Sequence, residues 1–395
     1  MDYSQILSQQ FNIKEEYAKN IITLLDDGNT IPFIARYRKE MHGSMDDQLI
    51  REFAEKLEYL RGLDKRRDEI RSLIDAQEKL TDEINLALDK AATLSELEDI
   101  YRPYRPKRKT RASIAKEKGL EPLANNILKQ EKGFDPSKSA VDYIDEEKGV
   151  TSVEDAIQGA MDIIAELVSD NAEIRKRIRN LTNANGVLVS VATDEEKDSV
   201  YKNYYDYKEP VKKIAGHRVL AVNRGEKEGF LKVSVETDSE KPLNSIFRAM
   251  ITDKNQLCSD IIREACTDAY QRLIYPSIER EVRNDLTDTA SENAMKVFAV
   301  NLKQLLMQPP VKGKTVLALD PGYRTGCKTA VVDSTGKVLD TTVIYPTHSD
   351  KKIQESKQTL LRLIKKHHVD IISIGNGTAS KETEMFTAET IKEAD

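Results

Sequence analysis

Residues 315–326 read TVLALDPGYRTG, and this stretch decides the fold of the C-terminal part of the chain. A short apolar run that ends at a Pro-Gly turn is typical of a buried β-strand. The run covers residues 315–319, so Asp320 falls where the strand ends. The sequence therefore predicts a strand that presents one carboxylate at its end.

The residues that follow predict an α/β arrangement. Further apolar runs indicate strands at 329–332, 338–345 and 369–374, with helices at 350–366 and from Ser380 onward. Three hairpin-like strands, a crossover helix and a parallel strand fit a ribonuclease-H-like fold, but they are too few for a complete layered domain. We therefore expect residues 314–395 to be the N-terminal part of a truncated α/β domain, in a chain that is itself an N-terminal fragment.

Asp320 is the candidate for chemistry. Ribonuclease-H-like folds place their first metal-binding carboxylate at the end of the first strand, and two-metal chemistry needs further carboxylates to hold a second ion about 4 Å away. The end of the fourth strand, residues 374–378, reads IGNGT and contains no acid. Asp320 is therefore a weak catalytic candidate, and the same Asp-x-Gly turn also opens the actin-like phosphotransferase fold. The five histidines show no ligand spacing, so we expect no metal site and no cofactor.

Residues 1–310 read as helix almost throughout, up to a Pro/Gly-punctuated boundary at 308–313. A long apolar stripe begins after Asp46, with Gly62 as the candidate break. A later stripe places Cys258 and Cys266 near one helix face, where they fit buried thiols.

A small β element interrupts this helical region within about residues 186–236. Residues 187–191 form a short apolar run, and 218–223 and 230–236 flank a loop as the arms of a hairpin. The predicted fold class is a mainly α-helical N-terminal region with a small β-hairpin element, followed by an incomplete α/β ribonuclease-H-like domain.

The composition leaves the partner open. The chain has 395 residues, with 61 Lys+Arg against 67 Asp+Glu and a net charge of −6. There is no apolar run long enough for a membrane span and no signal-peptide pattern at the N-terminus. Three cysteines without a CxxC pattern fit a reducing cytoplasm. Net acidity argues against nucleic acid only if the charges are evenly spread.

They are not evenly spread, because residues 101–111 read YRPYRPKRKTR and contain no acid. We call this segment the basic strip. Its prolines favour extended structure, in which cations could follow phosphates while rings stack on bases. The alternative is a loop whose arginines pair with carboxylates of neighbouring helices. The candidate nucleic-acid-binding residues are Tyr101, Arg102, Tyr104, Arg105, Lys107, Arg108, Lys109 and Arg111.

Two smaller basic segments are secondary. Residues 31–40 read IPFIARYRKE, and they either dock one helix on another or present Arg36 and Arg38 to phosphate. Residues 175–179 read RKRIR, which is interpreted as one solvated face of a helix.

Four motifs in order then point to a family. They are IPFIARYRKEM at 31–41, YRPYRPKR at 101–108, HRVLAVNRGEKE at 217–228 and LDPGYRTGCK at 319–328. Together they resemble the Tex family of bacterial RNA-binding transcription accessory proteins, over the whole chain. The resemblance implies a helix-turn-helix-like unit, a YqgF-type ribonuclease-H-like domain, and further helix-hairpin-helix and OB-fold elements beyond this sequence. Arg218 and Arg224, in the third motif, become further binding candidates.

The function expected from residues and resemblance is a non-catalytic, nucleic-acid-binding accessory scaffold of transcription. RNA is the expected ligand, with DNA as a second candidate, and RNA polymerase or the ribosome are candidate protein partners. The alternatives are a metal-dependent nuclease or resolvase that uses Asp320, and a protein–protein adaptor of the transcription or translation machinery. A cytoplasmic location without membrane contact is expected.

Overall fold

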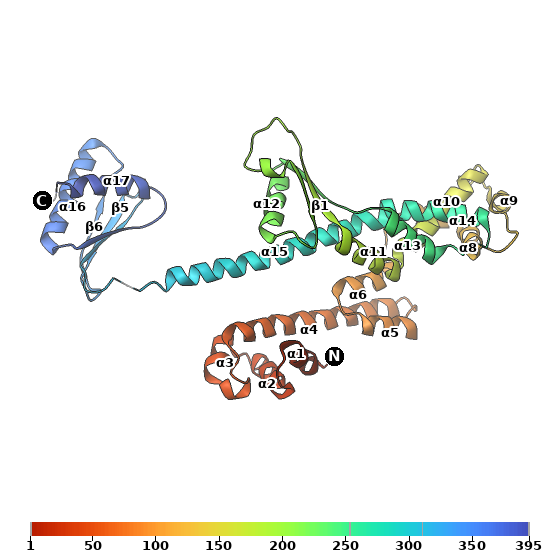
Figure 1. Ribbon diagram of the computed structural model, residues 1–395, viewed down its shortest axis with the longest axis horizontal. Coiled ribbons are helices and arrows are strands. Elements are labelled where there is room, and N and C mark those ends of the chain that lie inside the picture. Colours follow the sequence, from red (N-terminus) through yellow and green to blue (C-terminus); the bar gives the residue numbers. More distant parts are fainter. Residues whose placement is uncertain (1, 253, 310, 394–395) are drawn as a thin grey trace. The chain divides into compact units, whose positions relative to one another are not determined.

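The computed structural model describes residues 2–252, 254–309 and 311–393 (Figure 1). The chain divides into two compact units, residues 1–296 and 297–395. Pro310, which belongs to the predicted boundary, lies outside the described residues. Among the helices of the described part, none is long and apolar enough to cross a membrane.

The first unit begins with short helices that pack against one long helix, α4, and these elements follow one another along the chain. They are α1 (Tyr3–Phe11), α2 (Glu15–Asp26), α3 (Ile31–Tyr37), a 3₁₀ turn (Lys39–Met41) and α4 (Asp47–Asp75). The carboxylate of Asp46 caps α4 by accepting a hydrogen bond from the Leu49 amide at 2.7 Å. The break expected at Gly62 is wrong, because a buried stripe continues through Leu63 and Ile70 and holds the helix straight past this exposed glycine.

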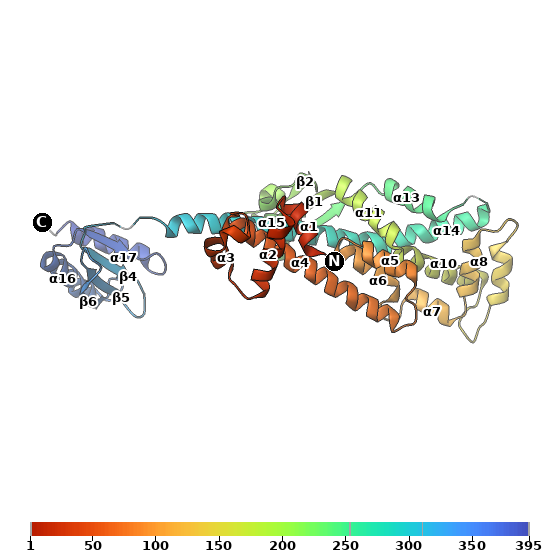
Figure 2. The ribbon, with the colours of Figure 1, turned by 90° about the horizontal axis from the view of Figure 1, so that it is seen from below.

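The next helices include α6 and α7, which the basic strip connects. They are α5 (Asp82–Lys90), α6 (Leu94–Tyr101), a 3₁₀ turn (Arg102–Tyr104), α7 (Arg111–Glu117), α8 (Glu121–Lys129), α9 (Pro136–Ala140), a 3₁₀ turn (Val141–Tyr143), α10 (Val153–Asp170) and α11 (Ala172–Asn185). Helices α5 and α6 pack on the second half of α4 (Figure 1). Helix α10 packs against α7, α8 and α14 and lies among them (Figure 2).

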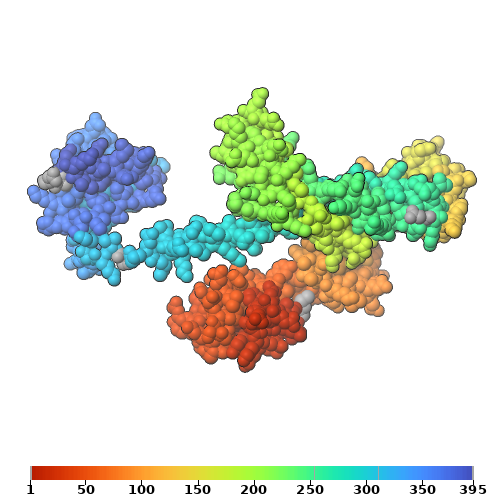
Figure 3. All heavy atoms as spheres, viewed as in Figure 1, coloured from red at the N-terminus to blue at the C-terminus, as the bar shows by residue number. Residues whose placement is uncertain are grey.

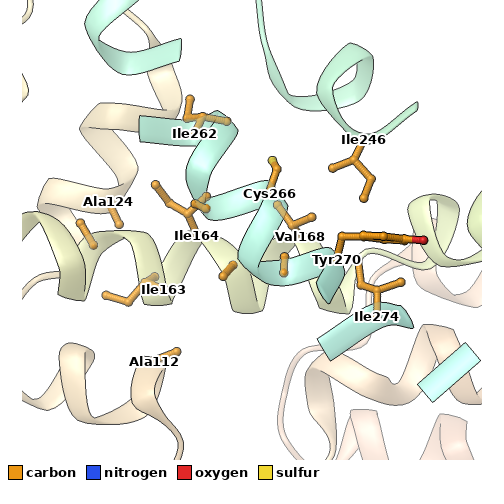
Figure 4. Close-up of a cluster of buried hydrophobic side chains, with 14 of the residues drawn as sticks. Ala112, Ala124, Ile163, Ile164, Val168, Ile246, Ile262, Cys266, Tyr270 and Ile274 are labelled. Carbon is orange, nitrogen blue, oxygen red and sulfur yellow. The ribbon is translucent and has the colours of Figure 1, made fainter. Parts of the chain in front are cut away.

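The largest hydrophobic core lies around α10. It joins α10 to α13 (Glu240–Met250), α14 (Gln256–Asp268), a π-helical turn (Ala269–Ile274) and α15 (Tyr275–Leu306). Figure 4 shows Ile164 and Val168 of α10 on the side that faces Ile262 and Cys266 of α14. Cys258 and Cys266 are fully buried, as predicted, and burial raises the pKa of the Cys266 thiol to about 12. These thiols therefore serve as small hydrophobic side chains.

The far end of α15 leaves this core. From Glu292 to Gln308 the side chains are exposed, including large apolar ones such as Phe298 and Leu305. Figure 3 shows this part of the chain in cyan.

The β element is a three-stranded antiparallel sheet. Its strands are β1 (Val187–Ala192), β2 (Asp206–Pro210) and β3 (Leu231–Glu236), in the order β2-β1-β3. A 3₁₀ turn (Lys202–Tyr204) precedes β2.

The hairpin arm predicted at 218–223 is wrong, because these residues belong to helix α12 (Gly216–Lys227). Val219 and Val222 are three residues apart and both buried, so the helical period outweighs the strand propensity of valine.

The second unit is the mixed sheet expected from the sequence. It contains β4 (Val316–Asp320), β5 (Cys327–Val332), β6 (Val338–Ile344), α16 (Asp350–His367), β7 (Ile371–Ile374) and α17 (Ser380–Ile391). The strand order is β6-β5-β4-β7; β7 runs parallel to β4, and the other pairs are antiparallel. Helices α16 and α17 bury one face of this sheet through Leu360, Leu363 and Phe386.

Candidate nucleic-acid interface

The basic strip is less extended than its prolines predict. Tyr101 ends α6, residues 102–104 continue it as a 3₁₀ turn, and the chain is irregular only from Arg105 to Lys109. Pro103 lies in the first turn of the 3₁₀ segment, where a missing N–H costs nothing. Thr110 then caps α7 through a capping box with Ser113.

The two tyrosines of the strip face inward. Tyr101 is only 6% exposed and packs in a cluster with Leu63, Ile70 and Leu97. Tyr104 is half-buried beside the same cluster. A buried ring offers no face to a base, so the stacking expected of Tyr101 is corrected: in this structure it is a core residue.

Two cations of the strip, Arg102 and Lys107, are paired with carboxylates of one helix, α10. The Arg102 Nε lies 3.6 Å from an Asp170 oxygen, and burial lowers the pKa of the Arg102 guanidinium below its ordinary value. The Lys107 ammonium pairs with Asp170 and lies 3.4 Å from a Glu166 oxygen. The Thr110 hydroxyl donates to Glu166 at 3.1 Å. The carboxylates of α10 thus neutralise this side of the strip.

These carboxylates recur every four residues, as Asp162, Glu166 and Asp170, and so form one row on a single face of α10. We call them the α10 acidic row. Burial raises the pKa of the Asp162 carboxyl, while the nearby positive charges of Arg272 and Arg111 oppose that rise. The row could be recognised from the sequence by its spacing, but its partners could not.

The remaining cations of the strip differ in their surroundings. Arg105 pairs with Glu98 of α6, and Lys109 lies 3.7 Å from Glu117 of α7. Arg108 and Arg111 are exposed and form no ion pair within the described part of the chain. Carboxylates of neighbouring helices therefore partner four of the strip's six cations.

The second basic segment, residues 175–179, is not a solvated helix face. Arg175 is 2% exposed and donates to Asp99 at 2.6 Å. Arg179 pairs with the same Asp99 and also donates to Glu281 at 2.6 Å. Asp99 itself is 4% exposed. Because the pairs join α6, α11 and α15, this cluster is a buried ionic joint.

The third basic segment lies on α3 and keeps its cations unpaired. We define the α3 patch as Phe33, Arg36, Tyr37, Arg38 and Lys39. Arg36, Arg38 and Lys39 form no ion pair within the described residues, although Glu40 follows directly. Tyr37 is 57% exposed. Of the predicted phosphate-binding residues, Arg36 and Arg38 are thus the ones that lie beside an exposed ring.

Tyr37, Phe33 and Lys39 were not singled out from the sequence. The usable signal was the spacing of the two aromatic residues, which are four apart and therefore share one face of a helix.

The two candidates on α12 are both paired. Arg218 donates to Glu209 of β2 at 2.9 Å. Arg224 donates to Glu228 at 2.8 Å, one turn further along. These ion pairs hold α12 to β2 and to its own last turn. Among the described residues, neither arginine is bonded to the α3 patch or to the basic strip.

Asp320 occupies the predicted place at the end of β4. Its carboxylate is exposed at the edge of a hollow of about 480 Å³ on the sheet face away from α16 and α17, beside Ala318, Lys328 and Thr341. Glu382 is held elsewhere by a 2.8 Å hydrogen bond from the Tyr323 hydroxyl. Over the described residues, no three His, Cys, Asp or Glu side chains converge as a metal site.

Comparison with known families agrees with this architecture. The Tex-like protein N-terminal domain matches residues 1–75, the Tex central region matches 131–298, and the Tex protein YqgF-like domain matches 314–395. These matches define a multidomain protein in which a mostly helical region precedes a YqgF-like domain. The α3 patch lies inside the first match, whereas the basic strip lies between the first and second.

Similar proteins extend along the whole chain. The Bacillus subtilis protein YdcI is 44% identical over 400 residues, covering 100% of this chain and 56% of that protein. The transcriptional accessory protein Tex of Neisseria gonorrhoeae is 38% identical, covering 99% of this chain and 52% of that protein. The human S1 RNA-binding domain-containing protein 1 is 32% identical, covering 99% and 40%. The chain belongs to the Tex family, and it spans about half the length of the curated bacterial relatives it matches.

Proposed function

We propose that this chain is a nucleic-acid-binding accessory factor of transcription without catalytic activity of its own. The observation that carries the proposal is the α3 patch, where three cations stay unpaired beside an exposed ring in a chain of net charge −6. A similar protein is described as a transcriptional accessory protein and another by its S1 RNA-binding domain, which supports the same class of function.

The partners follow from this proposal. RNA is the proposed ligand and DNA the second candidate, with RNA polymerase or the ribosome as the assembly in which it acts. The basic strip is proposed as a second contact, made by Arg108, Lys109 and Arg111, which are exposed. Three buried, unpaired cysteines fit the reducing cytoplasm as the proposed location.

A salt titration of oligonucleotide binding tests the proposal. Replacing Arg36, Arg38 and Lys39 together by alanine removes three phosphate contacts, so the slope of log K against log salt should flatten by about 2 units for a single strand. The matched control replaces Lys132, Lys232 and Lys241, three exposed lysines elsewhere that form no ion pair among the described residues, and should leave the slope unchanged. No binding of RNA or DNA by the unchanged chain at low salt would overturn the proposal.

The absence of catalysis has its own test. The chain is incubated with single-stranded and branched DNA and RNA in Mg²⁺ or Mn²⁺, beside the Asp320→Asn variant. We expect no cleavage from either protein. Cleavage that disappears in Asp320→Asn would instead establish a nuclease that uses this carboxylate.

A further inference from the structure

The α3 patch carries a pair of rings on one helix face. Phe33 and Tyr37 are one turn apart, and their ring centroids lie 5.4 Å apart at an interplanar angle of 46°. The Arg38 guanidinium lies over the Phe33 ring, 5.3 Å from its centroid. Of these two rings, Tyr37 is the accessible one, with 57% of its surface exposed.

The helix that presents these rings is held in place by contacts of its buried side. Ile34 is fully buried, and its carbonyl is 3.1 Å from the Nε2 of the buried His42. The Asn20 amide donates to the Met41 carbonyl at 3.1 Å and holds the turn that follows. Pro32 in the first turn and the Thr30 cap define the start of α3. An exposed ring on a fixed helix loses little entropy when a ligand stacks on it.

The cations flank Tyr37 along the chain, and none of them forms an ion pair among the described residues. Arg36 is one residue before Tyr37, and Lys39 begins the next turn. The Arg38 guanidinium donates to the Tyr37 carbonyl at 3.2 Å, which orients it beside the ring. Glu40, the acid of this segment, is exposed and forms no ion pair with them in the described structure.

We infer that the α3 patch binds single-stranded nucleic acid, with one base stacked on Tyr37 and the flanking phosphates on Arg36, Arg38 and Lys39. This inference rests on the proposed function and adds the class of ligand. The bases of a duplex are stacked inside the helix and present no face to a side chain, whereas every base of a single strand does. A duplex would use the cations alone.

Binding of a fluorescein-labelled 15-nucleotide single strand, compared with the same strand annealed to its complement, tests the inference. Loss of base stacking weakens binding by about 5- to 150-fold, so Tyr37→Leu should lose that much affinity for the single strand and little for the duplex. Tyr37→Phe keeps the ring and should bind the single strand within about twofold of the unchanged chain. Equal losses on both ligands, or no loss with Tyr37→Leu, would overturn the inference and leave the proposed function standing.

A second measurement does not depend on affinity. The chain contains no tryptophan, so a Tyr37→Trp variant has emission from this position alone. Stacking on a base should quench that emission when the single strand saturates the protein, and the duplex should not quench it. Unchanged emission with a bound single strand would overturn the stacking arrangement. If the unchanged chain binds neither ligand, the proposed function falls with it.

Discussion

By sequence the basic strip carries more positive charge than the α3 patch, but in the structure the α3 patch is the region whose cations all remain without an ion pair among the described residues. The strip has six cations and no acid in eleven residues, while residues 31–41 have three cations and one acid. In the structure, carboxylates of α6, α7 and α10 partner four of the strip's cations. The α3 cations have no such partners among the described residues.

The comparison shows that local charge in a sequence is not surface potential. The potential at a surface sums all charges nearby in space, and helices bring in carboxylates that are far away along the chain. Lys107 and Asp170 are 63 residues apart, for example, and yet they form an ion pair. A segment without acids can therefore be neutral where it lies, and a modest segment can stay positive.

The largest change in the free energy of unfolding is expected at the buried ionic joint of Asp99, Arg175 and Arg179. Asp99→Ala leaves Arg175 and Arg179 buried without their shared partner, which should lower the free energy of unfolding by about 3–5 kcal/mol. Urea denaturation measures it, with the exposed Glu40→Ala as the control at α3. A loss below about 1 kcal/mol would show that the joint does not stabilise this region.

The α10 acidic row provides the direct way to break the comparison. Neutralising it with Asp162→Asn, Glu166→Gln and Asp170→Asn together should release Arg102 and Lys107 of the strip for phosphates. The salt slope of single-strand binding should then steepen by about 1.4 units, because each of the two added contacts contributes about 0.7. Circular dichroism checks that the variant is folded. An unchanged slope in a folded variant would mean that the strip is a structural strap rather than a masked binding surface.

Removing a single cation should lower the free energy of unfolding more in the basic strip than in the α3 patch. Lys107→Ala removes partly buried ion pairs and should lower the free energy of unfolding by about 1 kcal/mol. Lys39→Ala removes an exposed side chain without an ion pair and should change it by less than about 0.5 kcal/mol. Urea midpoints of the two variants measure the contrast, and equal midpoints would contradict it.

The smallest effect concerns the pH dependence of the acidic row. Burial raises the pKa of Asp162, so the folded chain holds this proton more tightly than the unfolded chain does. Its contribution to stability is therefore present below the ordinary aspartate value, about 4, and is lost as the pH rises through the higher folded pKa. The stability of Asp162→Asn relative to the unchanged chain should then increase between pH 4 and pH 7. Denaturation of both proteins at several pH values measures the difference, and a difference of the opposite sign would show that Arg272 and Arg111 dominate.

The strand and helix pattern of the second unit could be predicted because its apolar runs are short and bounded by turns. The error at 218–223 arose because a valine-rich segment satisfies both periods, and only tertiary packing, such as that of Val222 against Leu188 and Leu231 of the sheet, decides between them. The position of Asp320 at the end of β4 followed from the Pro-Gly turn after it.

The sequence by itself determined the element types of the second unit, the buried thiols and membership in the Tex family. These features depend on the local period of apolar residues and on the order of the motifs, and both are properties of the sequence alone. Only the tertiary structure decided which positive charges remain available, because an ion pair depends on which helix faces meet. It placed Tyr101 in a core and the α10 acidic row against the basic strip, and it left Tyr37 and its cations exposed on α3.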